Sequence, residues 1–174
     1  MPTRPSDLLS FDHEDTQYTP SQETLKLYAS RCPTTQLPDR YRVTVANPNP
    51  PLVHFAFPAA ISKLYKYAYK HNLLKFFANF PKMISPVSAF AATRHLSDEV
   101  QYELEIAWPF GQTADCGVIL VLYNNYTMEE KMLINEDQED VIEMVQEELG
   151  YDKSVRPKWY FDFHDEWRPG DEAE

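Results

Sequence analysis

The sequence predicts an α+β fold: an antiparallel or mixed sheet of about four to five strands with two or three helices packed on it. Segments that alternate between apolar and polar residues, as strands do, are interspersed with segments that have helical periodicity. The chain has 174 residues, of which 43% are hydrophobic. That length and composition suit one domain with a substantial core.

The two ends of the chain are expected to lie outside the folded domain. Residues 1–21 are polar and interrupted by prolines, which predicts a flexible N-terminal arm. Residues 169–174 are predicted to be a flexible acidic tail, because they have no apolar set to bury. Residues 22–168 then form the single α+β domain.

The first half of that domain is expected to contain a short helix, an edge strand and a long helix. Ser21 can cap the short helix, and residues 41–45 alternate with the period of a strand. Pro58 suits the first turn of a helix over residues 58–80. The apolar residues in the two halves of that helix point about a third of a turn apart, so a kink or break is expected near His71.

The second half is expected to supply most of the sheet and a further helix. Four segments have strand patterns: 100–106, 118–123, 130–134 and 159–164. Residues 118–123 are apolar on both faces, which is typical of a central strand. Acidic residues followed by an apolar stripe predict a helix over 137–149, which Gly150 ends.

Charged residues are distributed unevenly along the chain. Residues 51–97 carry six basic residues and no acidic one, whereas residues 98–174 carry twenty-one acidic residues against five basic ones. The net charge of −11 makes binding to nucleic acid unlikely, because phosphate backbones are repelled. The simplest interpretation is that the basic segment packs against the protein's own acidic half. The alternative is that it contacts a partner or a membrane surface.

That alternative predicts a non-enzymatic protein-interaction or regulatory module. Its contact surface would be the basic, aromatic helix over residues 58–80 together with the acidic C-terminal half. The residues expected to bind the partner are Lys63, Lys66, Lys70 and Tyr67. The partner would be another protein or a second copy of the chain. A related hypothesis is a pocket lined by aromatic residues that binds a small apolar or aromatic ligand.

A small acid–base enzyme (a lyase, an isomerase or a hydrolase) is the competing hypothesis. Asp162 and His164 lie two residues apart on an expected strand, so they would share a face on which the carboxylate could orient the imidazole. Glu103 and Glu105 form a similar pair, and paired carboxylates can have separated pKa values. Ordinary alternation on a one-sided sheet also accounts for both pairs. The catalytic hypothesis requires the sheet to bring them together.

Other signals in the sequence mainly exclude classes of function. The four glycines form neither a dinucleotide-binding fingerprint nor a phosphate-binding P-loop, so no nucleotide cofactor is expected. Cys32 and Cys116 match no metal-site spacing and are expected to be reduced thiols, and no metal or other cofactor is expected. His54 and His95 are expected to be structural. The N-terminus has no secretory signal and no segment is long enough to span a membrane, which predicts a soluble cytoplasmic protein.

Overall fold

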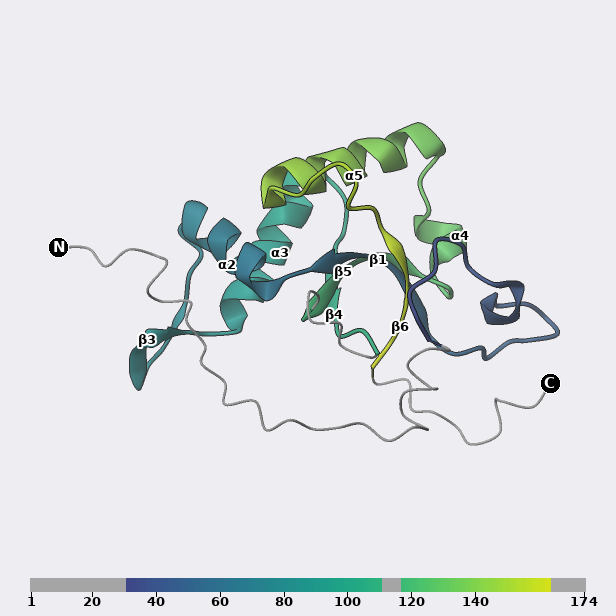
Figure 1. Cartoon of the computed structure of the whole chain (residues 1–174), viewed down its shortest axis with the longest axis horizontal. Helices are drawn as coiled ribbons and strands as arrows, with labels where there is room; N and C mark the ends of the chain where they lie inside the picture. Colours follow the sequence, from purple (N-terminus) through teal and green to yellow (C-terminus); the bar gives the residue numbers. More distant parts are fainter. Residues whose placement is uncertain (1–30, 111–116, 164–174) are drawn as a thin grey trace.

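The computed structural model of the chain describes residues 31–110 and 117–163, and these residues confirm the predicted α+β fold. Helices lie on one side of an antiparallel sheet, and a two-stranded hairpin projects beyond them (Figure 1). The predicted arm over 1–21 and the predicted tail over 169–174 lie outside the described residues. Among the described helices, none has the length and apolar character needed to cross a membrane.

The main sheet has the strand order β4-β5-β1-β6. Its strands are β1 (Val53–Ala59), β4 (Glu105–Ala107), β5 (Val118–Asn124) and β6 (Lys158–Phe161). The separate hairpin consists of β2 (Phe76–Phe77) and β3 (Phe80–Ile84). The helices are the 3-10 turn η2 (Asp39–Tyr41), α2 (Ile61–Lys70), α3 (Val87–Val100), the short α4 (Met128–Lys131) and α5 (Asn135–Leu149).

The main sheet curls so that its two edges approach each other. β4 pairs with β5 at one edge of the sheet. The chain that continues from β4 then reaches the opposite edge, where Pro109 forms a bridge with Asp162. There the Phe110 backbone N–H donates to the Phe161 carbonyl over 2.8 Å.

The two faces of the sheet bury different clusters of side chains. The face toward α2, α3 and α5 holds the main core, which includes the fully buried Phe57, Leu64, Leu120 and Ile142. The other face holds a small second cluster of Ala56, Ile119, Val121 and Tyr160. This division follows the alternation of side chains along β1, β5 and β6.

The segment expected to be one long helix over 58–80 instead forms β1, α2 and the hairpin. The prediction of a break is confirmed, because α2 ends at Lys70 and Asn72 has a left-handed φ of 58°. The start and the end of that helix were wrong. Pro58 lies in β1, where its missing N–H removes no bond to β6, since β6 pairs with β1 only from Val53 to Ala56.

Some of the other helices and strands predicted from the sequence are confirmed, and others were wrong. The predicted strand over 118–123 is confirmed as β5, the helix over 137–149 as α5, and part of the last strand as β6. The strand predicted over 100–106 reduces to β4, because Val100 still belongs to α3. The strands predicted over 130–134 and 41–45 were wrong: the first region holds the end of α4 and a loop, and the second a turn after η2. The helix α3 was not predicted.

Candidate functional site

Among the described residues, Asp162 pairs with His54. Asp162 follows β6, and its Oδ2 lies 2.8 Å from Nε2 of His54 on the central strand β1. Both residues are buried, at 7% exposure for His54 and 8% for Asp162. His164 lies outside the described residues. The pairing of Asp162 with His164 stays a prediction, and the fold brings a second histidine, His54, to Asp162 from a strand far away in the chain.

Only one of the two ring nitrogens of His54 has a hydrogen-bond partner among the described residues. Its Nε2–H donates to the Asp162 carboxylate, while its Nδ1 is buried and has no hydrogen-bond partner in the described part of the chain. A neutral imidazole held in this way keeps a lone pair on Nδ1, which can accept a proton or a hydrogen bond. His54 was expected to be structural, and a buried polar atom without a partner is uncommon in such residues.

Glu103 and Glu105 form a surface ion-pair group away from that histidine. Both are exposed, and they lie 2.9 Å and 3.5 Å from the Lys131 ammonium. The hydrogen bond from Lys131 holds the pKa of Glu103 below its usual range. The Lys131 ammonium is thus a partner of these glutamates, whereas His54 is a partner of Asp162. The catalytic role of Glu103, Glu105, Asp162 and His164 stays a prediction.

Two of the lysines expected to bind a partner contact the acidic helix α5 of the same chain. Lys63 Nζ donates to the Leu149 carbonyl over 3.2 Å and to the Gly150 carbonyl, and it lies 4.2 Å from the centre of the Tyr151 ring. Lys70 forms an ion pair with Glu148 at 3.1 Å. These contacts agree with the simplest interpretation of the charge distribution. Their role in partner binding stays a prediction.

The other two partner-binding candidates differ in accessibility. Lys66 is exposed and forms no hydrogen bond or ion pair with another described residue. Tyr67 is 2% exposed, its hydroxyl is hydrogen-bonded to His95 Nδ1 at 2.9 Å, and its ring stacks on His71. Burial, reinforced by nearby carboxylates, raises the pKa of Tyr67 to about 12. Tyr67 can reach a partner only if this packing opens.

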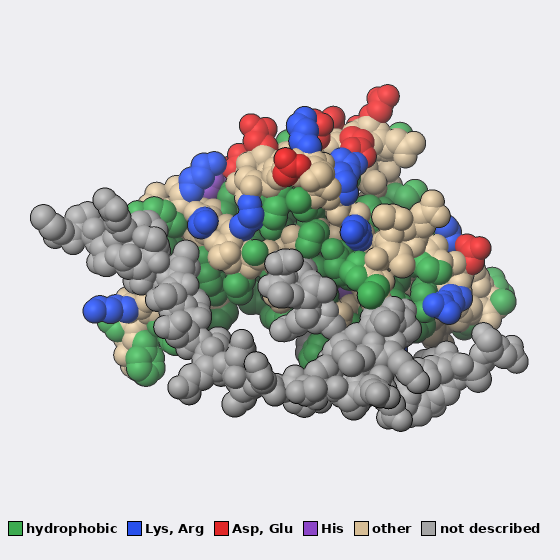
Figure 2. All heavy atoms as spheres, viewed as in Figure 1, with side chains coloured by type: hydrophobic (Ala, Val, Ile, Leu, Met, Phe, Trp, Pro, Cys, Tyr) green, Lys and Arg blue, Asp and Glu red, His purple; other side chains and the backbone are tan. Residues whose placement is uncertain are grey.

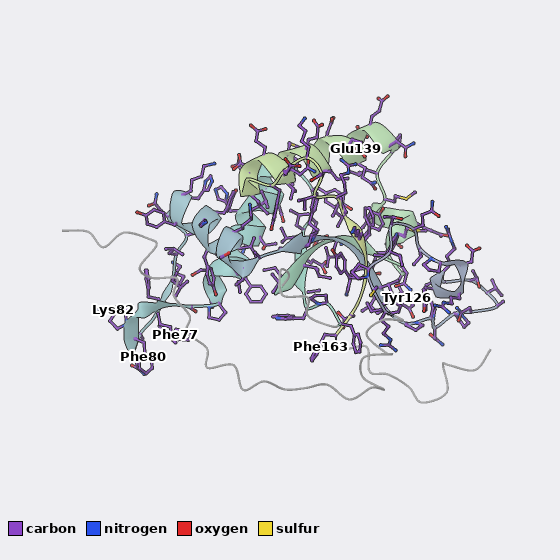
Figure 3. All side chains as sticks on the ribbon, viewed as in Figure 1. Phe77, Phe80, Lys82, Tyr126, Glu139 and Phe163 are labelled. Carbon is purple, nitrogen blue, oxygen red and sulfur yellow. The ribbon has the colours of Figure 1, made fainter. Side chains whose placement is uncertain are left out.

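The hairpin β2–β3 carries four large apolar side chains that are exposed to solvent. Phe76, Phe77, Phe80 and Met83 are 44%, 40%, 64% and 48% exposed. Figure 3 shows Phe77, Phe80 and Lys82 on this projection, away from the helices. Figure 2 shows the hydrophobic and basic side chains of the hairpin at one end of the molecule, while acidic side chains gather over α5. Sequence reasoning had placed these aromatic residues on the buried stripe of a helix.

The short two-residue segment between Phe77 and Phe80 was the signal that could have revealed the hairpin. Phe77 pairs with Phe80 across the turn formed by Ala78 and Asn79. Asn favours turns, and Pro81 is tolerated in a short edge strand but disfavoured inside a helix. Short segments of this kind carry too few residues to distinguish a hairpin from a helical turn by periodicity alone.

An aromatic groove on the helix side of the sheet bears on the ligand-binding hypothesis. The groove has a volume of about 730 Å³, and Phe55, Tyr123 and Trp159 form part of its lining. Phe55 and Tyr123 stack with their ring centres 4.9 Å apart. A small aromatic ligand in this groove stays a prediction. Within the described residues, no group of three or more histidine, cysteine, aspartate or glutamate side chains could hold a metal ion.

Comparison with protein families, curated proteins and solved structures gives no match in any of the three.

Proposed function

We propose that this protein is a non-enzymatic interaction module that binds another protein through the hairpin β2–β3. The observation that carries the proposal is the exposure of four large apolar side chains on one projecting element. Large exposed apolar patches on folded proteins commonly mark interaction sites. Aromatic residues and methionine are also the side chains most enriched at protein interfaces.

The hairpin is held in place before any partner arrives. The Lys75 backbone N–H donates to the Ser88 hydroxyl over 2.8 Å, and the Ser85 N–H donates to the Lys75 carbonyl over 2.8 Å. These bonds fix the base of the hairpin to the first turn of α3. A contact surface that is already ordered loses less entropy on binding, so fewer favourable contacts are needed for a given affinity.

The charge around the hairpin indicates what the partner surface looks like. Lys75 and Lys82 flank the apolar side chains and are exposed, and no acidic residue occurs between residues 51 and 97. A complementary partner would offer an apolar surface bordered by carboxylates. The proposed contact surface is basic and aromatic, as the sequence predicts. It lies on the hairpin, however, and not at Lys63, Lys66, Lys70 and Tyr67.

Site-specific photo-crosslinking tests this proposal. Replacing Phe80 with p-benzoylphenylalanine puts a light-activated probe on the hairpin, and the same replacement at Tyr69 is the matched control, since Tyr69 is 60% exposed on α2. In the cells that make the protein, the probe at position 80 should give a discrete crosslinked species that the probe at position 69 does not. The species should disappear when Phe77→Ser is added. No species from position 80, or the same one from both positions, contradicts the proposal.

A small acid–base enzyme is the second candidate function, and the unpartnered Nδ1 of His54 is the observation that favours it. Asp162 fixes the tautomer, and once local opening of the buried site lets a substrate reach Nδ1, that nitrogen can act as a general base toward a substrate proton. Purified protein should then turn over a member of a small-molecule library, and both Asp162→Asn and His54→Gln should abolish the turnover while the fold is retained. Turnover that survives His54→Gln would exclude this pair as the catalytic group.

A further inference from the structure

A second exposed apolar surface carries charge opposite to that of the hairpin. This α4–α5 corner comprises residues 128–140. Met132 and Ile134, in the loop between α4 and α5, are 55% and 80% exposed. The acidic residues around them that form no ion pair with a described residue are Glu129, Glu130, Glu136, Asp137 and Asp140. The corner thus combines apolar side chains with unpaired carboxylates, which is the chemistry that the hairpin requires.

The hairpin and the corner cannot meet within one molecule. Figure 1 places β3 at one end of the structure and α4, with the start of α5, at the other. Figure 3 shows the same separation between Phe80 on the hairpin and Glu139 near the start of α5. Contact between these surfaces therefore requires two copies of the chain.

An anionic membrane fits the hairpin less well than an acidic protein surface does. Segments that recognise anionic lipids usually carry about four to eight lysines or arginines, whereas the hairpin carries Lys75 and Lys82. The net charge of −11 also opposes approach to a negative surface. A second copy, in contrast, presents carboxylates beside apolar side chains.

We infer that the hairpin β2–β3 of one copy docks on the α4–α5 corner of a second copy, an inference that rests on the proposed function of the hairpin. The two contacting surfaces are different, so the association is head-to-tail and leads to a ring or an open chain. Phe77 and Phe80 pack against Met132 and Ile134 of the next copy, while Lys75 and Lys82 face its carboxylates. Because the surfaces are small, the association is weak and depends on concentration.

Complementation between two variants tests the inference. Phe77→Ser with Phe80→Ser disables the hairpin, and Met132→Ser with Ile134→Ser disables the corner; all four side chains are exposed, so both variants should fold. By sedimentation velocity from about 10 µM to about 1 mM at low salt, the wild type should rise above its monomer mass of 20.3 kDa, and each variant alone should not. An equimolar mixture should form a dimer of twice that mass, because one intact hairpin meets one intact corner. Tyr69→Ser is the control and should associate like the wild type.

The charges give an independent measurement on the same protein. Lys75→Glu with Lys82→Glu should weaken association by up to about fivefold for each lysine at low salt, and by less in high salt. A wild type that stays at 20.3 kDa at every concentration, or a variant mixture that stays monomeric, overturns the inference.

Failure of this inference can be told apart from failure of the proposed function. If the probe at position 80 crosslinks to a different protein while the wild type stays monomeric, the second-copy partner is wrong and the interaction module stands. Binding of the wild type to phosphatidylserine vesicles, lost in Phe77→Ser with Phe80→Ser, would instead assign the hairpin to a membrane and overturn both. A crosslink to the protein's own chain supports both.

Discussion

Reversing the charge of Lys63 tests whether the basic helix α2 is neutralised within the chain. Lys63 donates to two carbonyls at the C-terminal end of α5, the negative end of the helix dipole. Lys66 lies one turn away on the same helix, is exposed and has no hydrogen bond or ion pair with another described residue. Lys66→Glu is therefore a matched control for Lys63→Glu, with the same change in net charge.

The expected loss for Lys63→Glu is the sum of three modest contributions. A cation at the end of a helix contributes about 0.3–1 kcal/mol. A cation near an exposed aromatic ring, as Lys63 is near Tyr151, contributes about 0.5–1 kcal/mol. The glutamate adds repulsion from the Leu149 and Gly150 carbonyls, for a total of about 2 kcal/mol in the free energy of unfolding. Lys66→Glu should change it by about 0.5 kcal/mol or less.

Thermal unfolding at low ionic strength measures the difference. For a chain of 174 residues, 1 kcal/mol corresponds to about 2–4 °C in Tm, so Lys63→Glu should lower Tm by about 4–8 °C and Lys66→Glu by less than about 2 °C. Part of the effect should vanish in high salt, since charges near the surface are screened. Equal shifts for the two variants, or no shift for either, would refute the contact between α2 and α5.

Three further predictions concern buried polar groups. Burial raises the pKa of Tyr67 and of Tyr123 to about 12, above the value of about 10 of an unfolded tyrosine. Stability that is present below pH 10 should therefore be lost as the pH rises from 10 to 12. Urea unfolding across that range measures the loss, and the stability of the control Tyr67→Phe should depend less on pH. Asn125→Ala removes bonds to three backbone groups and should lower the free energy of unfolding by about 2–4 kcal/mol, with faster hydrogen exchange over residues 41–51. Asp162→Ala leaves both His54 ring nitrogens unpaired and should lower it by about 1–3 kcal/mol in urea unfolding.

The sequence predicted an element correctly where one physical requirement, such as burial of both faces of a strand, determines its residues. β5 is apolar from Val118 to Tyr123 because both of its faces are buried, and α5 has an acidic start, an apolar stripe and a glycine with a φ of 61° after its end. The end of α3 lacks such a signal, because its left-handed position is Gln101, with a φ of 52°. Without a glycine there, the alternation from Val100 onward resembled one long strand.

The candidate sites depended on long-range packing, which local patterns do not contain. Asp162 and His54 are 108 positions apart and meet because β6 pairs with β1. The compensation of basic by acidic residues was predictable in outline, since opposite charges in one chain tend to pack together. Which lysines take part was not, because α2 turns Lys63 and Lys70 toward α5 and leaves Lys66 in solvent.

Folding alone does not account for the composition of the hairpin. Of its strand residues, Ile84 belongs to the main core, whereas Phe76, Phe77, Phe80 and Met83 remain largely exposed. A strand exposed in this way favours aggregation, and polar or charged residues at its open positions would lower that risk without loss of core packing. Its attachment to α3 through backbone and serine groups would be unaffected by such replacements. The aromatic side chains thus add an exposed apolar surface that the core does not use, and contact with another molecule is the physical process that would bury it.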